Sequence, residues 1–175
     1  MAILAQGRVE DFLGVSPRSA NSNNQTVFKS ATGEWRRSGV ASSSGLDCAV
    51  NFSSKAGGVV LIGPTPDGSK GTILFIGTKL VPVKTMNETM VALLTDLDLS
   101  NRAMQPVKAF QLAGEQAGVA IATDMAATLR GMTDIKRVAL NHNGNVVFEL
   151  AIDGVFAARD ALAQCMGLPA ITTGR

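Results

Sequence analysis

Residues 146–166 read VVFELAIDGVFAARDALAQCM, and this stretch contains two different hydrophobic periods. Its first seven positions are rich in β-branched and apolar residues, which is typical of a strand. Asp153 and Gly154 interrupt the run, and apolar residues then recur at helical spacing at Val155, Ala158, Leu162, Cys165 and Met166. We therefore predict a strand over 146–152 followed by a C-terminal helix near 155–166, ending before Gly167 and Pro169.

A tight turn is expected just before this strand. Asn143 and Gly144 form the dipeptide that most strongly favours a two-residue hairpin, and the apolar runs 137–140 and 146–152 flank it. His142 is the single histidine of the chain. It falls in the predicted loop without a neighbouring carboxylate to orient it, so we predict a solvent-exposed histidine and not a general base.

Further upstream, short apolar runs alternate with turn-forming residues. The runs cover 26–29, 34–38, 46–52, 58–62 and 72–76, and their spacing of roughly ten residues predicts an antiparallel meander. The sequence PTPDG at Pro64 to Gly68 predicts a hairpin loop. Residues 90–97 and 119–122 extend the sheet, with a turn expected at Ala117 and Gly118.

A second helix is predicted near 124–132. Asp124 is a favourable N-cap residue, and Met125, Leu129 and Met132 follow it at helical spacing. The predicted fold class is therefore α+β, mainly antiparallel β, as a meander or sandwich-like sheet with helices near 124–132 and 155–166.

The N-terminal part differs in composition from the rest. Residues 1–15 contain apolar positions partly at helical spacing and predict an N-terminal arm. Residues 16–25 are rich in Ser, Ala and Asn without periodicity, which predicts a flexible linker. Residues 26–175 then form a single β-rich domain, in keeping with a chain of 175 residues.

Composition excludes several classes of function. With 16 basic and 14 acidic residues the formal net charge is +2, and no basic patch predicts binding to nucleic acid. One histidine, two cysteines and no tyrosine leave few candidates for a metal site or nucleophile, so we expect no cofactor, no metal and no enzymatic activity. No run of 18 apolar residues is present, so we expect no membrane span.

The two cysteines are both predicted to face the core. Cys48 lies in a predicted strand, and Cys165 lies on the apolar stripe of the C-terminal helix. If that helix packs on the same sheet face, a disulfide closes a loop of about 117 residues. The alternative is two unpaired core cysteines, which behave as small hydrophobic residues.

Trp35, Arg36 and Arg37 form the candidate partner contact of the sequence. A tryptophan beside two arginines is a composition found at protein interfaces. The alternative places Trp35 in the core and the two arginines at a solvated strand end.

Three features together carry a resemblance to a known family: Trp35 at the start of a strand, Cys48 shortly after it, and the closing stretch 147–165. In these features the chain resembles the small periplasmic proteins related to invasion-associated locus B. The resemblance implies an exported β-rich domain with no assigned catalytic residues.

Two functional hypotheses follow. The first is a non-enzymatic exported domain, periplasmic or secreted, that binds a protein or envelope partner. The second is a self-assembling structural subunit of a virion, tail or filament, in which the N-terminal arm docks on a neighbouring copy.

Overall fold

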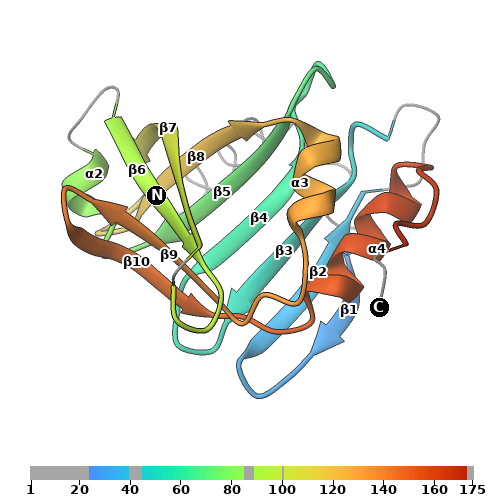
Figure 1. Ribbon diagram of the computed structural model, residues 1–175, viewed down its shortest axis with the longest axis horizontal. Helices are drawn as coiled ribbons and strands as arrows, with labels where there is room; N and C mark the ends of the chain where they lie inside the picture. The colour runs from blue at the N-terminus through green and yellow to red at the C-terminus, as the bar shows by residue number, and fades with distance from the viewer. Residues whose placement is uncertain (1–23, 40–44, 85–88, 100, 173–175) are drawn as a thin grey trace.

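The computed structural model describes residues 24–39, 45–84, 89–99 and 101–172, which form one ten-stranded sheet and three short helices (Figure 1). The predicted arm (1–15) and all but the end of the predicted linker (16–25) lie outside these ranges. The elements, in chain order, are β1 (Gln25–Lys29), β2 (Gly33–Ser38), β3 (Ala49–Ser54), β4 (Val59–Pro64), β5 (Gly71–Gly77), α2 (Val81–Lys84), β6 (Thr89–Thr95), β7 (Asn101–Gln111), β8 (Ala117–Thr123), α3 (Met125–Gly131), β9 (Arg137–His142), β10 (Asn145–Ala151) and α4 (Val155–Cys165).

The first five strands form the antiparallel meander predicted from the sequence. Each of β1 to β4 pairs with the next strand along the chain. The predicted loop around Pro64 to Gly68 does connect β4 to β5, closed by a hydrogen bond from the Thr65 N–H to the Lys70 carbonyl. Beyond β5 the spatial order changes to β8, β7, β6, β9 and β10, with every pairing antiparallel.

Two local predictions about the middle of the chain were wrong or incomplete. Ala117 and Gly118 lie in β8 and not in a turn. The Phe110 ring lies across Gly118, and a Cβ atom at position 118 would come within 2.3 Å of Cζ of Phe110. The close packing of this ring therefore favours glycine there. The eleven-residue strand β7 was not predicted, since Pro106 lies in its middle and most of its first half is exposed.

The sheet is strongly curled, and one hydrophobic core fills its concave side. Buried residues from β2 to β10 and from the helices α2, α3 and α4 belong to a single cluster. The rings of Phe75 (β5) and Phe148 (β10) lie 5.3 Å apart, although four strands, β8, β7, β6 and β9, lie between β5 and β10 in the order of the sheet. The last strands therefore fold back over the middle of the sheet (Figure 1). All ten strands belong to one continuous curled sheet.

Both predicted helices are present. Asp124 caps α3, accepting a hydrogen bond from the Ala127 N–H at 2.7 Å. The helix α4 packs on β1, β2 and β3 and buries Val155, Ala158 and Leu162, as its apolar spacing predicted. Figure 1 shows α4 beside the edge formed by β1 and β2.

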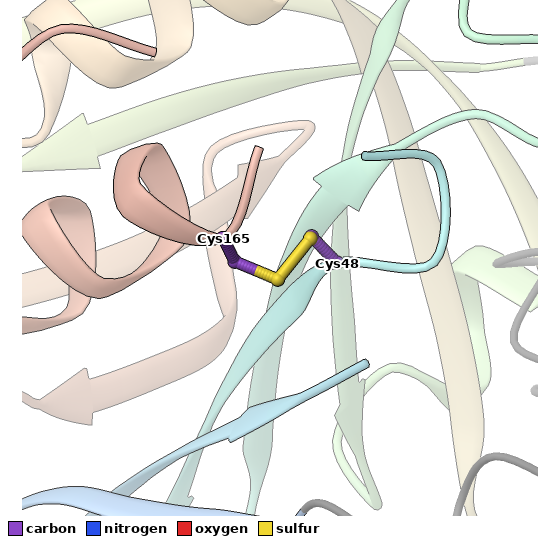
Figure 2. The surroundings of a disulfide bond; sticks show 2 residues. All are labelled: Cys48 and Cys165. Atoms are coloured by element: carbon purple, nitrogen blue, oxygen red, sulfur yellow. A yellow bond between two sulfur atoms is a disulfide. The ribbon is translucent and has the colours of Figure 1, made fainter. Parts of the chain in front are cut away.

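The predicted disulfide is confirmed. Cys48, directly before β3, and Cys165, the last residue of α4, are bonded, and their Cα atoms lie 5.9 Å apart (Figure 2). Both residues are 1% exposed. The bond joins the C-terminal helix to the strand face on which it packs.

The predicted hairpin at Asn143 and Gly144 is also present, but His142 does not lie in its exposed loop. Both turn residues have positive φ, 52° and 85°, as a two-residue turn of this kind requires. His142 ends β9, is 6% exposed, and lies 3.0 Å from the Thr89 hydroxyl through Nε2. The prediction of a solvated histidine was wrong, because β9 continues two residues beyond the apolar run and β6 covers its end.

Candidate binding site between the two halves of the sheet

Trp35 does not form the surface contact predicted from the sequence. Its side chain is fully buried, its Nε1–H donates to the Asp153 carbonyl at 2.8 Å, and its ring packs 5.4 Å from that of Phe52. The alternative, a core tryptophan, describes the structure correctly. A tryptophan can satisfy its single N–H inside a core when a backbone carbonyl faces it.

Arg36 and Arg37 lie on opposite faces of β2. Arg36 is exposed and pairs with Glu34, with 3.2 Å between Nε and Oε1. A hydrogen bond from Thr26, followed by one from Arg36, lowers the pKa of the Glu34 carboxyl. Arg37 is half-buried, with a buried Nε that has no hydrogen-bond partner. The three predicted contact residues therefore do not form one surface.

A different feature of the sheet has the properties of a binding site. The strand β7 pairs with β6 from Asn101 to Val107, but with β8 only from Lys108 to Gln111. The strand β8 pairs with β5 along its whole length to Thr123. Residues 101–107 of β7 and 121–123 of β8 are therefore not joined to each other, and we call this gap the split.

The position of the split follows from the sequence of β7. Continuing the register beyond Lys108 and Ala120 would place Val107 opposite Ile121 and Pro106 opposite Ala122. Proline has no backbone N–H to give to a ladder. The pairing of β7 with β8 ends two residues after Pro106, and the two strands separate there.

A cleft of about 610 Å³ opens on the inner face of the split. Its walls come from Ala103 and Gln105 of β7, Thr123 of β8, and Ala127 and Gly131 of α3. Its floor is formed by core side chains: Trp35, Val60, Ile62, Phe75, Val138 and Ile152. The volume and the apolar lining are those of a small-ligand or side-chain binding site.

A second hollow of about 500 Å³ lies on the outer face of the split. It is lined by Pro106 and Lys108 of β7, Ala120 and Ala122 of β8, and Pro66 of the hairpin loop, among others. Ala122 lines both the cleft and this outer hollow. The opening is thus present on both faces of the sheet at the same strands.

Acidic side chains lie at one end of the cleft. Asp96 and Asp134 line a small hollow of about 230 Å³ that shares Ala103 and Gly131 with the cleft, and Asp124 lines the cleft itself. Asp134 is paired with Lys136, whose Nζ also lies 3.0 Å from Asp153. Hydrogen bonds to Asp134 and then Asp153 raise the pKa of Lys136, and the hydrogen bond from Lys136 lowers that of Asp153.

Sequence reasoning did not find the split. Its inner walls consist of small or unremarkable residues such as Ala103, Ala122, Ala127 and Gly131, which carry no motif. Pro106 was the one signal available, since a proline inside a strand predicts an interrupted ladder.

Among the residues that the structure describes, no group of three or more His, Cys, Asp or Glu side chains is placed to hold a metal, and no helix is long and apolar enough to cross a membrane.

A comparison of the chain with protein-family models, with curated proteins and with solved structures found no match.

Proposed function

We propose that this chain is a non-enzymatic binding domain of an exported protein, and that the split binds an extended segment of a protein partner. The observation that carries the proposal is the split itself, in which two strand edges face each other above an apolar cleft. In an antiparallel strand, every second residue directs its N–H and C=O to the same side. Alternate residues of 101–107 therefore direct these groups away from β6 and toward the split.

Such an edge recognises an extended backbone. A strand that enters the split gains main-chain hydrogen bonds from the edges, and its alternate side chains enter the cleft. Native proteins usually cover or blunt a strand edge of this kind, because an open edge pairs with other chains.

Two observations support export. The Cys48–Cys165 disulfide belongs to the class of bond that persists in oxidising compartments. The resemblance of Trp35, Cys48 and the stretch 147–165 to the family of invasion-associated locus B implies the same location.

The test uses the single tryptophan as a reporter of the cleft, since Trp35 lines its floor. Ten-residue segments are selected from a random phage-displayed library against the oxidised chain, resynthesised, and titrated while Trp35 emission is followed. We expect selected segments with alternating apolar residues, and a loss of affinity of at least about tenfold in Ala127→Leu, which fills the cleft.

Ala126→Leu is the matched control. Ala126 is an exposed neighbour on the same helix that does not line the cleft, so its substitution leaves binding unchanged. A selection that yields no binding segment contradicts the proposal. So does a set of segments that bind Ala127→Leu as tightly as the unaltered chain.

A further inference from the structure

We propose that the segment that fills the split is the N-terminal stretch Ile3 to Val9 of a second copy of this chain, so that two copies or more assemble by exchanging a strand. This inference rests on the proposed function, because it needs the split to accept an extended segment. It adds the identity of that segment and of the partner.

The first argument is the sequence of the segment. Residues 3–9 read ILAQGRV, and the alternate positions Ile3, Ala5, Gly7 and Val9 are all apolar or small. Although the arm also has apolar residues partly at helical spacing, this period of two is that of a strand with one buried face. In an inserted strand, these four side chains would face the cleft while Leu4, Gln6 and Arg8 faced outward.

The second argument is length. The segment has seven residues, and the stretch of β7 that pairs only with β6 runs from Asn101 to Val107, which is also seven residues. The chain outside the described structure at this end comprises residues 1–23, and β1 begins at Gln25. Residues 10–24 span up to about 50 Å when extended, which is enough to reach a neighbouring copy.

The third argument favours a second copy over the same chain. Met90, Met104 and Pro106 lie together on the outer face of β6 and β7, because Met90 is opposite Pro106 in the register and Met104 is two residues away. We call these residues the methionine patch. The exposed fractions of Met90 and Met104 are 47% and 57%.

An arm that folded back onto its own domain would leave the methionine patch uncovered. A second domain, brought to the split by its arm, can cover it. Exposed, contiguous apolar side chains beside an open strand edge are typical of an interface between proteins.

The experiment mixes two samples of the full oxidised chain, one labelled with ¹³C and one with ¹⁵N and deuterium. Nuclear Overhauser contacts are then recorded only between differently labelled copies. We expect contacts from Ile3 and Val9 methyl groups to backbone amides of residues 101–105 and 121–123. The mass in solution is expected to rise with protein concentration.

Variants in the full chain sharpen the result. Ala127→Leu blocks the cleft and is expected to weaken assembly at least about tenfold, while Ala126→Leu leaves it unchanged. Ile3→Asp places a charge on the face that enters the cleft and is expected to weaken assembly as strongly as Ala127→Leu.

Three outcomes overturn the inference: a chain that stays monomeric at every concentration, contacts between the arm and the split within one copy, or assembly that Ala127→Leu does not weaken. If library segments bind the split while any of these outcomes is found, the proposed function stands and only the identity of the segment is wrong. If nothing binds the split, both fail.

Discussion

At the scale of single residues, a few polar groups in the hydrophobic core are held in position by specific partners. The Trp35 N–H donates to the Asp153 carbonyl, and the His142 ring contacts the Thr89 hydroxyl at 3.0 Å. Thr123 and Thr128 join β8 to α3 through their hydroxyls. Loss of the first two contacts leaves a buried group without a partner. The Thr128 hydroxyl keeps one, because it also donates to the Asp124 carbonyl at 2.8 Å.

We predict that His142→Ala destabilises the protein by about 1–3 kcal/mol, because it removes a buried side chain and leaves Thr89 without its partner. The measurement is urea unfolding of the oxidised chain. Asn145→Ala, at an exposed position in the same hairpin, is the control and is expected to change stability by less than about 0.5 kcal/mol. Equal stability of both variants would show that the contact contributes nothing.

A second prediction concerns acid stability. Hydrogen bonds from the Thr65 hydroxyl, then from the backbone and side chain of Ser69, lower the pKa of Asp67 to about 2. The unfolded value is about 3.9, so the folded state binds this proton less readily than the unfolded state. The contribution of Asp67 is therefore complete above about pH 4 and is lost as the pH falls toward 2.

Asp67→Asn is expected to remove that part of the pH dependence. Urea midpoints measured from pH 7 to pH 2 should fall less steeply below pH 4 in this variant than in the unaltered chain. Glu115→Gln changes an exposed carboxylate in a different turn and serves as the comparison. Identical profiles for Asp67→Asn and the unaltered chain would rule out a role for the loop hydrogen bonds.

At the scale of elements, the connection from β10 to α4 depends on one glycine. Gly154 has a φ of 72°, and a Cβ atom there would come within 2.2 Å of the Phe28 ring on β1. The close approach lets the helix start against the edge strand. Gly144 in the β9–β10 hairpin has a similar φ of 85° but nothing within 4 Å of its Cβ position.

This pair of glycines separates backbone strain from steric overlap. We predict that Gly144→Ala destabilises the protein by about 1 kcal/mol through strain alone, and Gly154→Ala by more than about 2 kcal/mol because overlap with Phe28 is added. Thermal or urea unfolding of the two variants measures the difference. Equal losses would mean that Phe28 moves aside freely.

At the scale of the whole molecule, the disulfide closes most of the described chain into one loop. Cys48 and Cys165 are separated by 117 residues, so the bond restricts nearly the whole unfolded domain. In the chain-entropy model, a loop of this length stabilises the folded state by about 4–5 kcal/mol.

We predict that the double variant Cys48→Ala with Cys165→Ala loses stability of that order when compared with the oxidised chain. Reduced and alkylated protein is the second sample, and it should lose a similar amount. Since a domain of this size has a total stability of only about 5–15 kcal/mol, either form should unfold at much lower urea. Unchanged unfolding midpoints would show that packing of α4 suffices without the bond.

The sequence determined the local structure of much of this protein. Short apolar runs between turn residues located the meander of β1 to β5 and the hairpin of β9 and β10. Helical spacing located α3 and α4, and a cap residue marked the start of α3. The pairing of Cys48 with Cys165 was predictable too, because one lies on a buried strand face and the other on the buried stripe of the last helix. The strands, turns and helices depend on neighbouring residues, so a single chain segment carries the information, whereas the cysteine pairing follows from the burial expected at two distant positions.

Only the tertiary structure decided which strands meet after β5 and where they separate. The order β5, β8, β7, β6, β9 and β10 brings together segments distant along the chain. The burial of Trp35 and His142 depends on that order, since Asp153 and Thr89 reach them from other parts of the sequence. The split arises for the same reason: Pro106 ends a ladder only once β8 lies beside β7, and small residues become the walls of a cleft only when curling of the sheet and α3 brings them face to face.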